Sequence, residues 1–244
     1  MNTLKCENIK FKYPGMKLKR DLKWFIDISS ITFNSGDVYS LRGENMSGKS
    51  TLVKLITGSL PYYPKSFFAG YLSVGNLKYS FPIKPNIVRN LGIGAVHQLD
   101  PMFPELSIWQ NIELGKPKHY KYSNNKKIIK SRIREIIKEF STEKDVSIHN
   151  PLGELSGGAK SICRILRIIL WDYKFIFLDE PTINLDENNY ELAFKLLNEE
   201  KKDRTYVLIS FNKNDHDNFK KYTDDGKFKM ESLTLENGKL IKDD

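Results

Sequence analysis

Short, mainly apolar runs alternate with amphipathic stretches along most of this chain. Runs of this length and composition are typical of strands that are buried on both faces of a parallel sheet. They occupy 37–41, 93–96, 175–178 and 206–209. The amphipathic stretches carry apolar residues at helical spacing, and the clearest lie at 52–57, 155–170 and 187–202. Because buried strands and helices alternate from 155 to 221, the pattern predicts a largely parallel sheet with helices on its faces.

The N-terminal part has a different pattern. The segments 3–13 and 24–33 alternate loosely between apolar and polar residues, and 67–80 contains one or two strands around Gly75-Asn76. Alternation with a period of two is typical of strands that face a core on one side. We therefore expect an antiparallel β part ahead of the more parallel core.

A helical lobe is predicted between the core elements. Ser107 is a favourable N-cap for a helix over 107–114. The segment 115–150 is rich in Lys, Asn and Glu, and its isoleucines recur at helical spacing between 128 and 137. We expect this part of the chain to form a small, inserted helical subdomain.

The whole chain, 1–244, is expected to form a single domain. Its core would consist of 1–98, which includes the antiparallel part, and 151–244, with the helical subdomain at about 99–150 between them. In the tail, turn signals at Gly226 and at Asn237-Gly238 predict short strands.

Composition narrows the class of protein. The chain has 244 residues, 40% of them hydrophobic, which is enough to bury a substantial core. No apolar run reaches the length of about 18 residues that spans a membrane, and the N-terminus lacks the apolar core of a signal peptide. The two cysteines, Cys6 and Cys163, fit no metal or disulfide framework. We therefore expect a reducing, cytoplasmic setting.

The net charge of +9 has two explanations. A basic balance is found in proteins that bind nucleic acid or anionic lipid. The lysines of this chain are dispersed, however, apart from a denser run over 116–130. We therefore favour lysines spread over solvated faces and do not expect nucleic acid as a partner.

The segment GENMSGKST has the phosphate-binding loop pattern G-x-x-x-x-G-K-[ST]. Glycines let backbone N–H groups surround phosphate oxygens, Lys49 reaches the β- and γ-phosphates, and the Ser50 hydroxyl ligates Mg²⁺. The helix that follows directs the positive end of its dipole at the same anion. The expected nucleotide-binding residues are Gly43, Glu44, Asn45, Met46, Ser47, Gly48, Lys49, Ser50 and Thr51.

Two adjacent acids follow the buried run at 175–178. Asp179, at the strand end, is expected to ligate Mg²⁺ or to hold its water shell. Glu180 is expected to polarise an attacking water as a general base. Adjacent acids at a strand end could form an ordinary surface turn, but a phosphate loop in the same chain favours the catalytic interpretation.

Three motifs in order, GENMSGKST, LSGG and FIFLDEPT, resemble those of the ATP-binding cassette (ABC) ATPases, and the resemblance covers nearly all of the chain. It implies an α/β fold with a P-loop NTPase core and a mostly parallel sheet, an N-terminal antiparallel β-subdomain and an inserted helical subdomain. In this family the LSGG segment binds the γ-phosphate of ATP held by a partner in a head-to-tail dimer. That role falls here on Ser156, Gly157 and Gly158.

The resemblance assigns further positions one at a time. Tyr13 corresponds to an aromatic residue that stacks on adenine, with Phe11 as the other choice and a packing role as the alternative. Gln98 corresponds to a glutamine that contacts Mg²⁺, senses the γ-phosphate and takes part in catalysis. The loop 99–106 is similar to the surface that meets a membrane partner. Asp186 corresponds to the acid of a loop at the dimer contact.

The chain departs from the family pattern at several positions, among them Ile183 and Asn184, which replace a pair of small residues. Phe211 stands where a switch histidine is usual, and phenylalanine has no hydrogen bond to donate to a γ-phosphate. Ala159 replaces a glutamine after LSGG, and Met46 replaces a glycine in the phosphate loop. The loss of one catalytic hydrogen bond can cost about 10²–10³ in rate. We expect hydrolysis because Lys49 and Glu180 are present, with a weakened site paired with a better partner chain as an alternative.

The resemblance implies the nucleotide-binding subunit of an ABC transporter, with ATP and Mg²⁺ as ligands. The expected partners are a second ABC ATPase subunit, separate transmembrane permease subunits and, in importers, a solute-binding protein. The expected location is the cytoplasmic face of the cell membrane. The segments GIGAVHQ and LSIWQNIELG are most similar to importers of sugars and related solutes.

Several alternatives stay open at this point. One is a soluble ABC ATPase that acts on nucleic acid or the ribosome, although such proteins usually carry two cassettes or long coiled coils. Another is a regulatory protein that binds ATP without turnover. The cargo, the direction of transport and the choice between homodimer and heterodimer are open as well.

Overall fold

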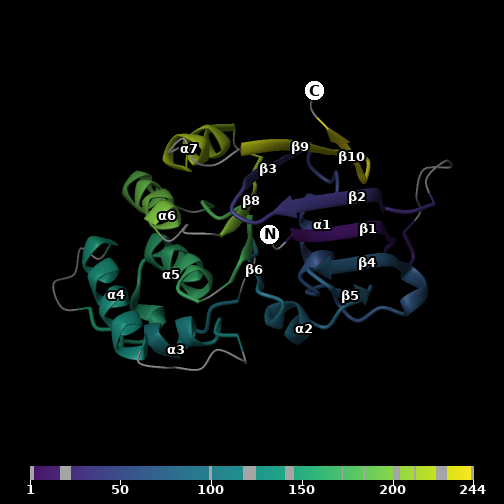
Figure 1. Ribbon diagram of the computed structural model, residues 1–244. Helices are drawn as coiled ribbons and strands as arrows, with labels where there is room; N and C mark the ends of the chain where they lie inside the picture. Colours follow the sequence, from purple (N-terminus) through teal and green to yellow (C-terminus); the bar gives the residue numbers. More distant parts are fainter. Residues whose placement is uncertain are drawn as a thin grey trace.

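The computed structural model describes most of the 244-residue chain. The described residues are 3–16, 23–98, 101–117, 125–140, 146–171, 173–183, 185–199, 204–211, 213–223 and 230–242. Two β-sheets and a layer of helices make up this part of the protein (Figure 1).

The larger sheet has six strands in the order β10-β9-β3-β8-β7-β6. They are β3 (Val38–Arg42), β6 (Ile93–Val96), β7 (Phe175–Asp179), β8 (Thr205–Ile209), β9 (Met230–Glu236) and β10 (Lys239–Lys242). β3 pairs in parallel with β8 and β9, and β7 pairs in parallel with β6 and β8. β10 returns antiparallel to β9. The prediction of a largely parallel core sheet is confirmed.

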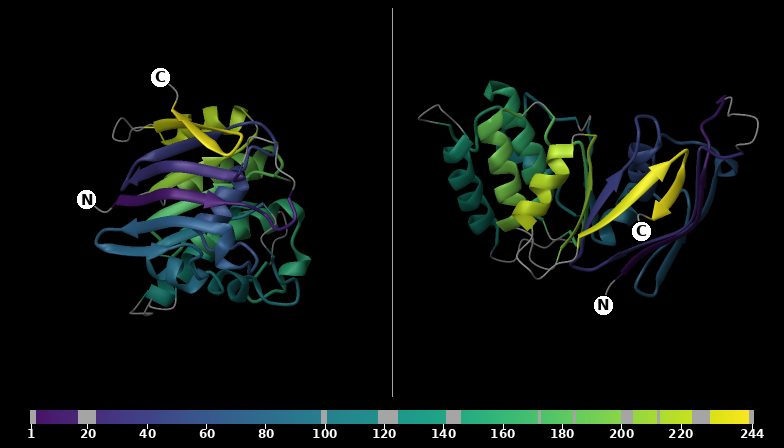
Figure 2. Two further views of the ribbon diagram at one scale, coloured as in Figure 1. Left: turned by 90° about the vertical axis from the view of Figure 1, so that its right-hand side faces the viewer. Right: turned by 90° about the horizontal axis from the view of Figure 1, so that it is seen from above.

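The smaller sheet is antiparallel, as the alternating pattern predicts. Its four strands are β1 (Thr3–Phe11), β2 (Ile26–Asn34), β4 (Phe68–Val74) and β5 (Leu77–Ser80), in the order β2-β1-β4-β5. A short 3-10 helix, η1 (Lys65–Phe67), leads into β4. Figure 2 shows this sheet and the helical layer on opposite sides of the six-stranded sheet.

Helix α1 (Lys49–Ile56) contributes to the buried core between the two sheets. Successive side chains of a strand point to opposite faces of a sheet, so each strand of the larger sheet contributes side chains to the core on both faces. Phe175 and Phe177 of β7 belong to the core that includes α1, whereas Ile176 and Leu178 belong to the core under the helical layer. This burial on both faces explains why the central strands are continuous apolar runs.

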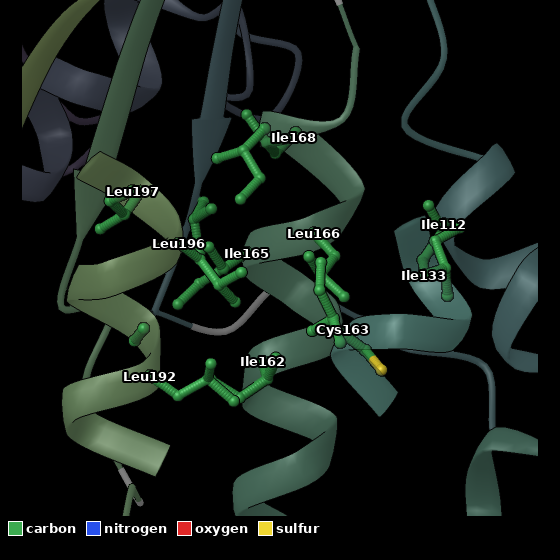
Figure 3. Close-up of a cluster of buried hydrophobic side chains, with 14 of the residues drawn as sticks. Ile112, Ile133, Ile162, Cys163, Ile165, Leu166, Ile168, Leu192, Leu196 and Leu197 are labelled. Atoms are coloured by element: carbon green, nitrogen blue, oxygen red, sulfur yellow. The ribbon is translucent and has the colours of Figure 1, made fainter. Parts of the chain in front are cut away.

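The helical layer covers the other face of the large sheet. It comprises α3 (Ile108–Glu113), α4 (Asn125–Phe140), η2 (Leu152–Glu154), α5 (Gly157–Ile169), α6 (Glu187–Glu199) and α7 (Lys213–Thr223). Figure 3 shows α5 between α6 on one side and α3 with α4 on the other. Ile165 of α5 lies toward Leu196 of α6, and Leu166 lies toward Ile133 of α4.

Most predicted elements are present, with ends that shift by a few residues. The expected helices at 107–114 and 187–202 are α3 and α6, and Ser107 accepts the Gln110 N–H in a capping box. Helix α2 (Pro85–Asn90) is an element that the pattern does not predict, because it follows Lys84 and lacks the N-cap side chain that marks the equally short α3. Gly226 and the parts 99–100, 118–124 and 141–145 of the expected helical subdomain lie outside the described residues. The division of the chain at about 99 and 150 stays a prediction.

Candidate functional site

The phosphate-binding loop connects β3 to α1. The parallel strands β3, β7 and β8 end in register, with Leu41 and Asp179 both opposite Ile209. The carboxyl ends of parallel strands meet at one edge of a sheet, which is where ligands bind in open α/β folds. The loop after β3, the acids after β7 and the segment after β8 therefore meet at this edge.

Glycine is required at two points of the loop. Gly43 has φ 146°, and a Cβ there would lie 2.2 Å from the Leu235 carbonyl oxygen. Gly48 has φ 106° and is the N-cap of α1, and a Cβ there would lie 2.6 Å from Ile26 Cδ1. Other residues rarely adopt such φ values, and any side chain would strike these neighbours.

Met46 also has a positive φ, of 63°, and its side chain is 92% exposed. Met46 thus replaces the glycine of the family pattern at a position where the backbone is left-handed. The methionine side chain therefore points to solvent and leaves the interior of the loop open.

Lys49 lies inside the loop that it follows. Its Nζ donates hydrogen bonds to the Gly43 carbonyl at 2.7 Å and to the Glu44 carbonyl at 2.9 Å. Burial lowers the pKa of the Lys49 ammonium, while the charges of Glu180 and Asp179 act in the other direction. The cation is thus held where an incoming phosphate would replace the two carbonyl oxygens.

Ser50 and Asp179, the two metal ligands that the sequence predicts in these motifs, lie in contact. Ser50 Oγ donates a hydrogen bond to Asp179 Oδ1 at 3.0 Å. Asp179 is 1% exposed, and its Oδ2 has no hydrogen-bond partner among the described residues. Burial raises the pKa of this carboxyl, which is the expected cost of placing a charge in a protein interior. A buried carboxylate oxygen beside a hydroxyl oxygen fits a Mg²⁺ ion, which binds hard oxygen ligands.

Glu180 is fixed by the segment that follows β8. Its Oε1 accepts the Phe211 N–H at 2.9 Å, and its Oε2 lies 3.1 Å from the Ser210 hydroxyl, whose one proton it shares with Asp215. The backbone of Glu180 is left-handed, with φ 52°. Burial raises the pKa of the Glu180 carboxyl, against the lowering effect of the two hydrogen bonds. Both carboxylate oxygens are therefore oriented by neighbouring groups.

Glu180 is connected through Ser210 to a buried polar network. The sequence interpretation missed this network. Asp215 is 1% exposed and accepts the hydroxyl of Ser210 at 2.7 Å, that of Thr182 at 2.6 Å and that of Tyr190 at 2.8 Å. A sequence signal existed for Ser210, because it follows a buried strand at the edge where Asp179 and Glu180 lie. Asp215 gave no comparable signal, because it lies within a helix.

A cavity of about 560 Å³ opens over the phosphate loop. It brings together the expected site residues Tyr13, Asn45, Met46, Gly48, Lys49, Ser50, Thr51, Gln98 and Glu180. Met16, Phe25 and Phe211 complete its lining, and the first two were missed in the sequence. Phe211 is 64% exposed, so its ring stands at the cavity in place of the usual histidine.

Tyr13 lies at the cavity and also packs against other aromatic residues. It lines the cavity and shares a hydrogen bond of 2.8 Å with Thr51 Oγ1. It also packs edge to face with Phe11 and Phe25, at centroid distances of 4.7 Å and 5.4 Å. Phe11 is fully buried, so its ring offers no face to a ligand, and Tyr13 is the better candidate for adenine.

Gln98 borders a second cavity, of about 570 Å³, which is also lined by Ser50 and Asp179. The Gln98 carbonyl accepts a hydrogen bond from Arg164 Nη1 at 3.0 Å. Pro101 and Phe103, from the loop expected to meet a membrane partner, line the same cavity. This second cavity thus connects that loop with the expected metal ligands.

The LSGG segment forms the start of α5. Ser156 is the N-cap, and its Oγ accepts the Ala159 N–H at 3.2 Å. A Cβ at Gly158 would lie 2.6 Å from Asn189 Nδ2, whereas Gly157 faces open space. Asn189 donates from its backbone N–H to Asp186 Oδ1 at 2.9 Å, which lowers the pKa of the Asp186 carboxyl. The residues 156–158 do not line the cavity at the phosphate loop. In the single chain, these predicted residues are therefore separate from the other predicted site residues.

The phosphate loop between a parallel strand and a helix, with acids at the end of another strand of the same sheet, defines a P-loop nucleotide-binding protein. A family model described as ABC transporter matches residues 26–183, which is more than half of the chain. The chain belongs to the ABC transporter family.

Curated relatives support the same family. The L-arabinose transport ATP-binding protein AraG of Geobacillus stearothermophilus is 30% identical over 210 residues, which cover 84% of this chain and 38% of the relative. The ribose import ATP-binding protein RbsA of Lactococcus lactis is 29% identical over 175 residues, which cover 70% of this chain and 34% of the relative. The chain therefore spans little more than a third of the length of these relatives.

Solved structures show the same fold. A nucleotide-free ATP-binding cassette from an ABC transporter superposes with a TM-score of 0.71 and 23% identity, covering 99% of this chain and 90% of that chain. A dimeric cassette in a post-hydrolysis state, bound to ADP and Pi, has a TM-score of 0.70 and 20% identity, covering 98% of both chains. Within the described residues, no helix has the length and apolar character needed to cross a membrane.

Proposed function

We propose that this chain binds and hydrolyses ATP with Mg²⁺ and is the nucleotide-binding subunit of a transporter. The observation that carries the proposal is the convergence of the phosphate loop, Gln98 and Glu180 on one cavity of about 560 Å³, with Asp179 bonded to Ser50 of that loop. A cavity of this size is in the range of small-molecule and cofactor sites.

In the proposed complex the phosphates of ATP lie in the loop. Lys49 exchanges its hydrogen bonds to the Gly43 and Glu44 carbonyls for bonds to phosphate oxygens. The start of α1 adds backbone N–H groups and the positive end of its dipole. Tyr13 stacks on the adenine, and its hydrogen bond to Thr51 fixes the tilt of the ring.

Ser50, Asp179 and Gln98 would hold Mg²⁺. The ion supplies positive charge that offsets the negative charge developing on the transferred phosphoryl group. Two protein ligands and a neighbouring amide suit Mg²⁺, which commonly takes its other ligands from water and substrate phosphates. Across the described ranges, no group of three or more histidine, cysteine or acidic side chains is arranged to hold a metal by itself. This supports a site that the nucleotide completes.

Glu180 acts as the general base in the proposed hydrolysis. A water molecule attacks the γ-phosphorus, its proton passes to the Glu180 carboxylate, and the bond to the bridging oxygen of ADP breaks. Burial raises the pKa of Glu180 and so makes the carboxylate a stronger base. The bonds from Ser210 and from the Phe211 N–H orient the carboxylate for this step.

The site is completed by a second cassette in a head-to-tail dimer. The start of α5, at Ser156, Gly157 and Gly158, is a helix N-terminus suited to an anion, and Gly157 faces open space. Because these residues do not line their own chain's cavity, they are free to contact ATP in a partner. Asp186, which is bonded to Asn189 beside Gly158, lies at the same contact.

Separate transmembrane permease subunits are the proposed partners on the membrane side. The relatives named above carry names of arabinose transport and ribose import proteins, and we assign this chain to the same class of solute importer. A solute-binding protein would then supply the cargo. The chain would work at the cytoplasmic face of the membrane, with the cavity around Gln98, Pro101 and Phe103 facing the permease.

One observation favours a heterodimer in which this chain is the less active subunit. Phe211 offers a ring instead of a hydrogen-bond donor at the cavity, and its N–H is already bonded to Glu180. In a heterodimer, a related chain with a histidine at this position would carry most of the turnover. The family relatives do not favour the soluble alternative that acts on nucleic acid or the ribosome.

The test is to measure ATP binding and phosphate release by the purified chain, with and without Mg²⁺, beside a Glu180→Gln variant. We expect both proteins to bind ATP and the unsubstituted one alone to release phosphate. Equal phosphate release by the two would refute Glu180 as the base. A pull-down from detergent-solubilised membranes then tests the transport role, since multi-span partners are expected in the eluate. Recovery of ribosomal proteins or nucleic acid that survives high salt would contradict it.

A further inference from the structure

The hairpin turn between β9 and β10, at Asn237 and Gly238, touches the phosphate loop. The hairpin, drawn in yellow at the end of the chain, lies against the start of β2 (Figure 1). The Gly238 N–H donates a hydrogen bond to the Ser47 carbonyl at 3.2 Å. The Gly238 carbonyl accepts the Asp27 N–H at 2.8 Å. A single residue therefore links the phosphate loop to the antiparallel sheet.

A second contact comes from β9. Leu235 is fully buried, and its carbonyl oxygen lies where a Cβ at Gly43 would come within 2.2 Å. Its Cδ2 would be 3.6 Å from a Cβ at Gly48. Both glycines of the loop are thus packed on the strand that leads into the turn.

The turn itself admits little change. Asn237 and Gly238 have φ 47° and 75°, as in the tight Asn-Gly turns that join antiparallel strands. A Cβ at Gly238 would lie 1.9 Å from the Phe25 carbonyl oxygen. Phe25 lines the nucleotide cavity. A side chain at 238 would therefore move the turn away from the cavity wall and from the phosphate loop together.

We propose that Gly238 is a positioning residue of the nucleotide site, and that the β9–β10 turn holds the phosphate loop at the distance from Phe25 that a nucleotide needs. The inference rests on the proposed nucleotide binding. Gly238 makes no contact with the cavity of its own and acts through the Ser47 carbonyl and the Phe25 backbone. Its effect should appear in nucleotide affinity.

The test compares Gly238→Ala with Gly75→Ala. Gly75 is a matched control because it has φ 57° in the turn between β4 and β5, and a Cβ there would meet nothing within 4 Å. Both variants place alanine at a positive φ, and one of them displaces the turn at the phosphate loop. We expect Gly238→Ala to weaken MgADP binding by about tenfold or more relative to Gly75→Ala. The displaced phosphate loop would lose a backbone hydrogen bond to a charged phosphate, and the loss of such a bond has this effect on affinity. Affinities within about twofold of each other, a difference too small for a lost bond, would refute the inference.

If Gly238→Ala does not fold, a measurement on the unsubstituted protein tests the role of the β9–β10 turn. Amide hydrogen exchange is followed with and without MgADP in peptides from 43–51, 230–242 and 74–80. We expect nucleotide to protect the first two and to leave the third unchanged. Protection of 43–51 alone would overturn the role of the turn. Failure of the unsubstituted protein to bind nucleotide would refute the proposed function itself, which separates the two conclusions.

Discussion

The Ser50 hydroxyl donates a hydrogen bond to the Asp179 carboxylate across 3.0 Å, although the two residues are 129 positions apart in the chain. This bond joins the first turn of α1 to the end of β7. It connects the two motifs on which the nucleotide site depends, and the other oxygen of the carboxylate is buried without a hydrogen bond among the described residues.

The first prediction concerns that carboxylate. Asp179→Asn keeps the shape of the side chain and removes a buried charge, so we expect an equal or higher melting temperature. We also expect the Mg²⁺-dependent gain in ADP affinity to be lost, since the neutral amide lacks the negative charge with which the carboxylate attracts Mg²⁺. Thermal unfolding and ADP titrations with and without a chelator measure both effects. Glu7→Gln, at an exposed ion pair with Lys5, serves as the control, and a variant that keeps its Mg²⁺ dependence would refute the assignment.

Phe211→His is expected to raise phosphate release. The Phe211 ring is 64% exposed at the cavity, so a histidine fits without repacking and supplies a donor to the γ-phosphate. We expect an increase of about tenfold or more, since a catalytic hydrogen bond is worth about 10²–10³ in rate. Phe211→Leu controls for the loss of the ring and should give no increase. An unchanged rate in Phe211→His would indicate that the donor comes from elsewhere in the assembly.

Because His216 is buried, we expect the stability of the protein to depend on pH. It is 3% exposed, its Nε2 donates to the Ser210 carbonyl at 2.8 Å, and its Nδ1 shares a hydrogen bond of 2.6 Å with Ser40 Oγ, which a neutral ring satisfies. Burial lowers the pKa of His216 below the ordinary value of 6.5, while Arg42 also disfavours the charged form.

The unfolded chain then binds more protons than the folded chain between the lowered pKa and about 6.5. The free energy of unfolding should therefore fall as the pH drops through this range. Melting temperatures at pH values from 8 to 5 measure the effect. We expect His216→Gln to be less stable at pH 8 and to lose less stability on acidification. Parallel pH curves for the two proteins would contradict a buried neutral histidine.

A substitution at Ile165 tests how much the packing of the helical layer contributes to the free energy of unfolding. It is fully buried on α5 between α6 and the sheet (Figure 3). Ile165→Ala should lower the free energy of unfolding by about 2–5 kcal/mol, because it leaves a cavity in a packed core. Ile128→Ala, at a side chain that is 64% exposed, should change it by less than about 0.5 kcal/mol. Equal effects in denaturant titrations would show that α5 is not packed as described.

The sequence predicted those parts of the site whose chemistry lies in adjacent residues. The phosphate loop is one continuous segment, and Asp179 and Glu180 follow directly after a buried strand. Outside the site, the Ser107 N-cap was predicted in the same way, whereas its pairing with Gln110 was not. Helix α2 escaped prediction because Lys84, the residue before it, provides no side-chain cap. Tyr13 was found through the family resemblance, but its bond to Thr51 was not.

What the sequence by itself determined was the kind of element at each place, because apolar spacing and turn residues act over a few neighbouring positions. The tertiary structure alone decided which elements meet. Parallel pairing of β7 with β8 brought Ser210 to Glu180, and parallel pairing of β3 with β9 brought Leu235 to Gly43 across most of the length of the chain. Backbone hydrogen bonds between strands do not depend on side-chain identity, so no local pattern specifies such partners. Gly238, at a turn with no chemistry of its own, acquires a place at the phosphate loop through that pairing.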